Sequence, residues 1–189
     1  TYTFKTISDS QQQTPVDGKY TFNDIVVREG TTKVQKFVYN DLANQQFVIN
    51  DKSIDKTTLI VKVKENESID DADAKTYKLF EIGADINDTS EVYFIYENYQ
   101  GNYQIEFGTG ILGKKPTVGS IISCEFVSTK GEDGNGINTF SFGTFGDTFP
   151  INDIEKIETA SRSAGGADRN TIENIKFNAP LSFVSKNRA

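Results

Sequence analysis

The stretch FGTGILGKKP, residues 107–116, has the glycine spacing of two nucleotide-binding motifs. Gly108, Gly110 and Gly113 satisfy the dinucleotide pattern G-x-G-x-x-G. Gly108 and the pair Gly113-Lys114 also nearly satisfy the phosphate-loop pattern G-x-x-x-x-G-K-[ST]. In both motifs, backbone N–H groups at the start of a helix hold a phosphate. The spacing therefore raises phosphate or dinucleotide binding as a hypothesis.

Phosphate binding requires a strand before the glycine loop and a helix after it. The segment YQIEF, 103–107, predicts the strand, but Lys115 stands where a magnesium-binding Ser or Thr is needed, and PTVGSII predicts a second strand. We therefore expect no nucleotide cofactor. We interpret the loop as a structural corner between two strands, with glycines in conformations that β-branched residues cannot adopt and a proline that fixes a turn. Its residues are Gly108, Gly110, Gly113, Pro116 and Gly119.

The composition removes several other kinds of catalysis. The chain has no histidine, which excludes a Ser-His-Asp triad, a Cys-His pair and a His-ligated zinc site. The single cysteine, Cys124, lies in the apolar run IISCEF and is interpreted as a small buried hydrophobic residue. The acidic cluster at 70–73 does not have the spacing of a calcium loop. We expect no catalytic residue, no metal site and no cofactor.

Charge and hydropathy limit the partners. The net charge is −7 and the pI is about 4.7, whereas nucleic-acid binding needs a basic surface. No apolar run approaches the ~18 residues of a membrane span. We expect no nucleic-acid partner, no membrane contact and no small-molecule substrate. A single cysteine fits folding in a reducing cytoplasm. Because the chain has no methionine, even at position 1, we expect it to be a fragment of a longer protein.

The pattern predicts a mainly β (α+β) protein, with antiparallel β-rich domains followed by short helices. Phe and Tyr make up all of the 12% aromatic residues, which favours strands. Strand-like runs lie at 46–50, 58–64, 76–82, 91–98, 103–107, 120–129 and 137–142. The turn YQGN predicts a hairpin between 91–98 and 103–107. KGEDGNG, 130–136, is interpreted as a hairpin tip.

Three regions are expected along the chain: a β-rich part over 1–66 with a linker-like start at 1–18, a β domain over 67–150, and a helical segment over 151–189. In the last region, NDIEKIETA predicts one helix. A second is predicted after Asp168, with a capping box at Asn170 and Glu173. Ile172 and Ile175 share its apolar face and are predicted interface residues, because two short helices must pack on something.

Two blocks of the sequence resemble the baseplate-J family of contractile-tail phages. The first, 103–136, has the Phe-Gly strand end, the glycine-rich loop, Gly-x-x-Pro, a further glycine and a Gly-Asn-rich turn. The second, 163–189, has a Gly-Gly-Ala-Asp segment, a short helix, Ala-Pro and Arg-Ala. The second block places family residues at Gly165, Gly166, Asp168, Pro180 and Arg188.

The first half of the chain, with FVINDKSIDKTTLIVKV, is similar to the T-even phage member of that family, a wedge subunit of the baseplate inner ring. One departure is Thr109, where the family often has Asp between two glycines. The resemblance implies a structural subunit that joins wedges into the ring and rearranges on contraction. Its implied partners are other wedge subunits and a second copy, as a homodimer or ring neighbour. Its implied location is the virion tail baseplate, and the host cytoplasm during assembly.

Two other functions stay open from the residues alone. Richness in Tyr and Phe also suits a receptor- or carbohydrate-binding β-sandwich of a tail fibre or adhesin, although the chain has no tryptophan for a sugar platform. The many Asp and Glu residues could supply a carboxylate hydrolase, but the sequence singles out no pair.

Overall fold

The computed structural model describes residues 1–6, 14–43, 45–141, 157–170 and 173–177. The chain forms two compact units. The first, called the sheet unit, comprises Arg28–Thr129 with Thr1 and Thr3–Lys5. The second, called the terminal unit, comprises Thr6–Val27 and Lys130–Ala189 with Tyr2.

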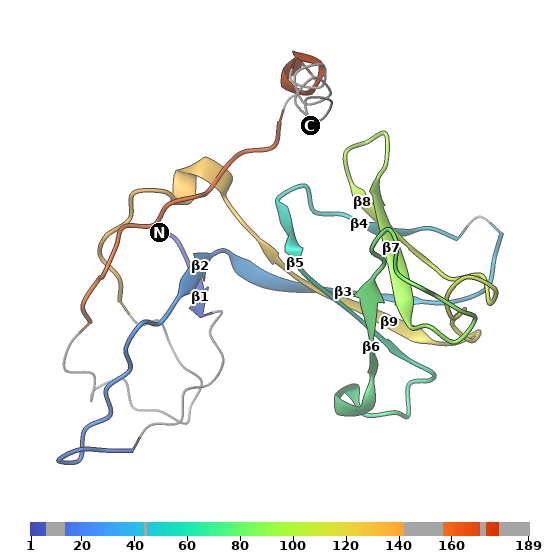
Figure 1. The fold of residues 1–189 in the computed structure, drawn as a ribbon, viewed down its shortest axis with the longest axis horizontal. Helices are drawn as coiled ribbons and strands as arrows, with labels where there is room; N and C mark the ends of the chain where they lie inside the picture. Colours follow the sequence, from blue (N-terminus) through green and yellow to red (C-terminus); the bar gives the residue numbers. More distant parts are fainter. Residues whose placement is uncertain (7–13, 44, 142–156, 171–172, 178–189) are drawn as a thin grey trace. The chain divides into compact units, whose positions relative to one another are not determined.

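The sheet unit is built on one seven-stranded sheet (Figure 1). Its strands, in spatial order, are β3 (Thr31–Val38), β9 (Ile121–Ser128), β5 (Ile54–Lys64), β6 (Lys75–Leu79), β7 (Val92–Glu97), β8 (Tyr103–Phe107) and β4 (Phe47–Ile49). All neighbours are antiparallel except β6 and β7, which are parallel. Two short strands, β1 (Phe4–Thr6) and β2 (Val27–Glu29), pair separately. The predicted mainly β class is confirmed.

Alternation along the strands sets the two faces of the sheet. On β5, Val61 is fully buried and Val63 is 5% exposed, whereas Ile60 is 43% exposed. On β9, Ile122, Cys124 and Phe126 are buried at alternate positions, and Val127 is buried as well. The register places Val61 opposite Cys124 and Val63 opposite Ile122, so the inward residues of the two strands form one layer.

The centre of the core is aromatic. The Phe47 ring contacts the edges of Phe37 and Phe107, each at a centroid distance of 5.6 Å, and stacks on Tyr39 at 6.0 Å. Tyr77 meets Phe107 edge-on at 5.5 Å. Edge-to-face pairs of this kind stabilise a core by about 0.5–1.5 kcal/mol each beyond area burial. The cluster draws residues from β3, β4, β6 and β8, so it ties the two ends of the sheet together.

Gln35 links the two edge strands, β3 and β4. Its Nε2 donates to the Val48 carbonyl oxygen at 2.8 Å, and its Oε1 accepts from the Asn50 N–H at 3.2 Å. A side-chain amide presents one donor and one acceptor, as a neighbouring strand would. Gln35 thereby curls the open sheet towards a closed barrel and covers part of its edges.

The terminal unit has little regular structure among its described residues. The segment 131–134 forms the 3-10 helix η2 (Gly131–Gly134), and 173–177 is helical. The strand predicted at 137–142 is wrong for 137–141, which are irregular. KGEDGNG is therefore no hairpin tip. Of the first predicted helix, residues 157–160 are not helical, and 152–156 lie outside the described residues.

The compact units divide the chain differently from the expected boundaries at 66/67 and 150/151. No division falls near residue 66, because β5 pairs with both β6 and β9 and so joins the two expected regions in one sheet. The C-terminal part of the terminal unit begins at Lys130, shortly after the end of β9. The units differ from the expected regions because strands far apart in the sequence pair with each other, and composition along the chain does not reveal such pairing.

Candidate functional site

The glycine loop between β8 and β9 folds back on itself at Gly108 and Gly113. A Cβ atom at Gly108 would lie 2.1 Å from the carbonyl carbon of Gly113 and 2.2 Å from its oxygen, so the two backbones are in direct contact. Gly110 and Gly113 have φ values of 85° and 78°, in the left-handed region that favours glycine. These are the conformations that the sequence predicts. Close approach at Gly108 and positive φ at Gly110 and Gly113 account for the glycines in the first half of the loop.

The folded loop is bound to the connection between β6 and β7. Gly113 N–H donates to the Asn87 carbonyl at 2.9 Å, and Lys114 N–H donates to the Ser90 carbonyl at 2.7 Å. A Cβ atom on Gly113 would lie 2.9 Å from Val92 Cγ2, so the side chain at the start of β7 packs directly on the loop. The loop therefore fixes the crossover that makes β6 and β7 parallel.

Pro116 and Gly119 form the second half of the corner. Pro116 is buried, and Gly119 has a φ of 89°. Gly119 N–H donates to the Tyr39 carbonyl at 2.8 Å, and Tyr39 N–H donates to the Ser120 carbonyl at 2.8 Å. These bonds extend the β3–β9 pairing past Val38, so the corner fixes the register of β9 against β3.

Four N–H groups of the glycine loop are already bonded within the protein. The N–H groups of Thr109, Gly110, Gly113 and Lys114 all donate to backbone carbonyls of the protein. A phosphate loop needs such N–H groups to point at the ligand, and it needs a helix to follow. Here β9 follows, beginning at Ile121. The geometry is that of a corner and not of a phosphate cradle.

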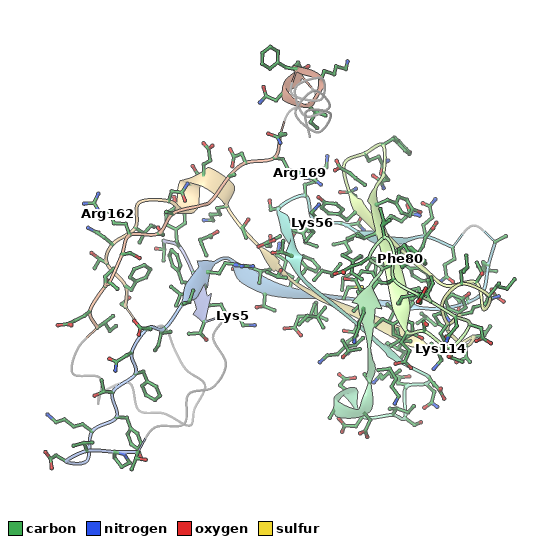
Figure 2. The ribbon with its side chains drawn as sticks, in the orientation of Figure 1. Lys5, Lys56, Phe80, Lys114, Arg162 and Arg169 are labelled. Carbon is green, nitrogen blue, oxygen red and sulfur yellow. The ribbon has the colours of Figure 1, made fainter. Side chains whose placement is uncertain are left out.

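Both lysines of the loop are also paired. Lys114 Nζ lies 3.2 Å from Glu91 Oε1, and Lys115 Nζ lies 2.7 Å from Asp41 Oδ1. The hydrogen bond from Lys115 lowers the pKa of the Asp41 carboxyl, and the same bond raises the pKa of Lys115. Lys114, which Figure 2 labels, is only partly exposed and already has a carboxylate partner.

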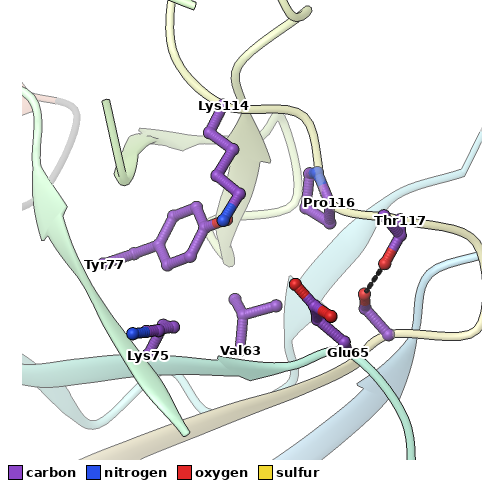
Figure 3. A pocket seen from close by; sticks show the side chains of 8 residues that line it. Val63, Glu65, Lys75, Tyr77, Lys114, Pro116 and Thr117 are labelled. Carbon is purple, nitrogen blue, oxygen red and sulfur yellow. Dashed lines mark hydrogen bonds between the residues drawn. The ribbon is translucent and has the colours of Figure 1, made fainter. Parts of the chain in front are cut away.

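A small cavity lies beside the corner (Figure 3). Its volume of about 20 Å³ has room for about one water molecule, far below the several hundred Å³ of a typical ligand pocket. Burial raises the pKa of Tyr77 in its wall to about 12, with further contributions from the charges of Glu91 and Glu65, so the phenol stays protonated at neutral pH. The lining residues are Val63, Glu65, Lys75, Tyr77, Lys114, Pro116, Thr117 and Ser120.

The remaining candidates for chemistry have structural roles. Cys124 is fully buried, and burial raises the pKa of its thiol to about 12. In the acidic cluster, Asp70 caps the 3-10 helix η1 (Asp71–Asp73) by accepting from Ala72 N–H, and Asp71 pairs with Lys64 at 2.7 Å. Among the described residues, no group of three His, Cys, Asp or Glu side chains could hold a metal ion, and no helix could span a membrane.

In the terminal unit, the turn 131–136 is joined to the segment 163–168. Asn135 Nδ2 donates to the Gly166 carbonyl at 2.8 Å, and Gly166 N–H donates to Asn135 Oδ1 at 2.8 Å. A Cβ atom on Gly166 would lie 2.3 Å from the Gly131 carbonyl oxygen, so only glycine fits there without a backbone shift. We call this pairing of 131–137 with 163–168 the latch.

Ser163 closes the other end of the latch. Its N–H donates to the Ile137 carbonyl at 2.9 Å, and its carbonyl accepts from Gly136 N–H at 2.8 Å. Its Oγ accepts from Ile137 N–H at 2.8 Å and donates to the Gly134 carbonyl at 2.7 Å. Four hydrogen bonds therefore converge on this one serine.

Asp168 also serves the latch. Its Oδ1 accepts from Glu132 N–H at 3.1 Å, in the first turn of η2. A Cβ atom on Gly131, which has a φ of 59°, would lie 2.1 Å from that oxygen. Asp168 therefore bonds to a turn more than 30 residues away in sequence. Residues 171–172, which follow it in the predicted helix start, lie outside the described residues.

No protein-family model matches this sequence, and no curated protein matches it. The assignment of a function therefore depends on the residues and their geometry.

The structure brings together part of the residues that the resemblance singles out. Gly166 and Asp168 lie in the latch. Gly165, which precedes Gly166 in the same segment, has a φ of 88°. Pro180 and Arg188 lie outside the described residues, as does Ile172. Ile175 lies in the helical segment 173–177 and is 54% exposed.

The terminal unit exposes many large apolar side chains. Beside Ile175, Phe177 is 74% exposed. Residues 20–26 are not in a strand, and the apolar residues among them are exposed. Clusters of exposed apolar residues in one region are typical of interaction surfaces. The exposed set on the N-terminal part is Val16, Tyr20, Phe22, Ile25 and Val26.

Gln35, Asn135 and Ser163 organise these sites through contacts that the sequence did not predict. Each acts through side-chain bonds to backbone groups more than ten residues away. A polar residue at an inward strand position was a usable signal for Gln35. For Asn135 and Ser163, local sequence gives no sign of the partner.

Proposed function

We propose that the chain is a structural subunit of a contractile phage tail baseplate wedge, which joins wedges into the inner ring and rearranges on contraction. One observation carries the proposal. The two separate sequence blocks that resemble the baseplate-J family meet in space, because the Gly-Asn-Gly turn of the first is bonded to the Gly-Gly-Ala-Asp segment of the second. Contact between them gives a physical reason for the two motifs to occur together.

The partner surface belongs to the terminal unit in this proposal. Its described part has little regular structure and exposes Ile175 and Phe177 on a helical segment of five described residues. Exposed apolar side chains of this size often mark a protein–protein contact. A second copy of the chain, as a homodimer or ring neighbour, would cover these side chains, and other wedge subunits would occupy further surface.

The test of this surface is the oligomeric state of the chain in sedimentation velocity. Replacing Ile175 and Phe177 with Asp should shift self-association to the monomer, because a charge would have to be buried against a partner. Ile82→Asp is the matched control, since Ile82 is fully exposed in the sheet unit. Unchanged association of the double variant would contradict the proposed contact.

A second candidate function is receptor or carbohydrate binding, as in a tail fibre or adhesin. It is favoured by Tyr99, which is 95% exposed at the tip of the β7–β8 hairpin and accepts a hydrogen bond from Gln100 Nε2 at 3.3 Å. An exposed aromatic ring beside an amide can stack on a sugar. Glycan-array binding that is lost in Tyr99→Ala would favour this candidate over the structural one.

A further inference from the structure

We propose that Asn135-Gly136 is a site of spontaneous deamidation, that the latch protects it, and that deamidation after the latch opens prevents its reclosure. This is the one Asn-Gly sequence in the chain. Asn followed by Gly is the sequence most prone to this reaction, because the glycine has no side chain to hinder cyclisation. Within the latch, both reacting groups are engaged.

The chemistry needs no cofactor. The Gly136 backbone nitrogen attacks Cγ of Asn135 and loses its proton to solvent. A bond forms between that nitrogen and Cγ, the bond from Cγ to Nδ2 breaks, and Nδ2 leaves as ammonia after taking up a proton. Water then opens the succinimide at either carbonyl and leaves Asp or isoaspartate at position 135. No group is oxidised or reduced.

The segment 163–166 holds the nucleophile and the electrophile at once. Gly136 N–H donates to the Ser163 carbonyl at 2.8 Å, so the proton that must leave is not available to solvent. The Asn135 amide is held at both atoms by Gly166, at 2.8 Å each, which fixes Cγ in place. Cyclisation therefore requires that segment 163–166 separate from the turn.

The product does not restore the latch. A carboxylate at position 135 has no donor, so an oxygen would face the Gly166 carbonyl oxygen where Nδ2 now donates. The new negative charge also joins Glu132, Asp133 and Asp168 in the same turn and segment. Two acceptors face to face and added like charge both favour the open form. Opening followed by deamidation would thus be a one-way release of 163–168.

The test is the rate of deamidation in the full chain, measured by mass spectrometry of the peptide that contains Asn135. The reference is a synthetic peptide of residues 130–138, which lacks the partner segment. We expect the folded chain to react at least about tenfold more slowly, because only the opened population reacts. An equal rate in chain and peptide would overturn the protection.

Variants separate the latch from general folding. Ser163→Ala removes the two bonds of Oγ and should speed deamidation several-fold, whereas Ser161→Ala, at an exposed serine of the same segment, should not. Gly166→Ala, whose Cβ would collide with Gly131, should act more strongly. Hydrogen exchange of β9 shows whether the sheet unit stays folded. Wild-type rates in both Ser163→Ala and Gly166→Ala would contradict the proposal.

The release step has its own readout. Asn135→Asp mimics one product and should make the amides of 163–168 exchange faster than in the wild-type chain. Unchanged protection of those amides would show that deamidation does not hold the latch open.

Discussion

Substitution of Gly108 by Ala separates close packing from backbone conformation. Gly108 is not in the left-handed region, so alanine carries no φ penalty there. Its Cβ would, however, lie 2.1 Å from the Gly113 carbonyl carbon and 2.5 Å from the Gly113 Cα. Backbone atoms cannot rotate away as a side chain can, so the two halves of the loop must move apart.

The expected loss of stability follows from what that movement breaks. Displacing Gly113 removes its bond to Asn87 and the bond from Lys114 to Ser90, at about 1 kcal/mol each. Overpacking strain adds about 1–3 kcal/mol. The free energy of unfolding should therefore fall by about 3–5 kcal/mol. Gly110→Ala has room for its Cβ, with the nearest atom at 3.8 Å, and a φ of 85°. The free energy of unfolding of this variant should fall by only about 1 kcal/mol. The cost of placing alanine in the left-handed region is partly offset by the lower conformational entropy of the unfolded chain.

The assay is urea unfolding of the full chain, followed by tyrosine fluorescence and circular dichroism of the sheet unit. The midpoint should drop strongly for Gly108→Ala and slightly for Gly110→Ala, with similar slopes. Equal losses in the two variants would refute the reasoning, because contact distance would then not decide the outcome.

Three further predictions concern the sheet unit. Gly113→Val combines positive φ with a clash against Val92 and should cost a few kcal/mol in the same urea assay; wild-type stability would contradict it. Gln35→Leu leaves the groups it bonds on β4 and after it without their partners and should cost about 1–3 kcal/mol, whereas a neutral result would mean that water replaces the amide. Burial raises the pKa values of Tyr77 and Tyr96 to about 12, whereas both phenols have a pKa of about 10 in the unfolded chain. The folded state therefore gains stability from the protonated phenols below pH 10. This contribution is lost as the pH rises towards 12. Because the pKa values of Tyr39 and Tyr93 are raised as well, phenolate absorbance should show a group of late-titrating tyrosines, and uniform titration near pH 10 would contradict this.

The strands were largely predictable from sequence. Runs of β-branched and aromatic residues bounded by turn residues located β5, β7, β8 and β9. The order of the strands in the sheet was not predictable from the sequence. β4 pairs with β8, and β5 pairs with β9, across more than 50 residues, and no local pattern encodes such pairing. The parallel neighbours β6 and β7 depend on a crossover that the glycine loop stabilises.

The site was predictable where a single residue type settles the geometry. Gly110 and Gly113 have the positive φ that their loop suggested, and the buried Cys124 suits its apolar run. The bond from Glu132 N–H to Asp168 was not predictable, because tertiary contact brings the two residues together and no local pattern indicates it. In the same way, the turn at 131–136 bonds to 163–168 instead of reversing a hairpin.

The most direct test of the proposed function is localisation on the particle. Antibodies against residues 1–189 would be applied to purified contractile phage tails, and to separated baseplate wedges, for negative-stain electron microscopy. The structural account predicts label at the baseplate, or on separated wedges if the assembled ring covers the epitope. Label confined to fibre tips, or on neither particles nor wedges, would contradict it.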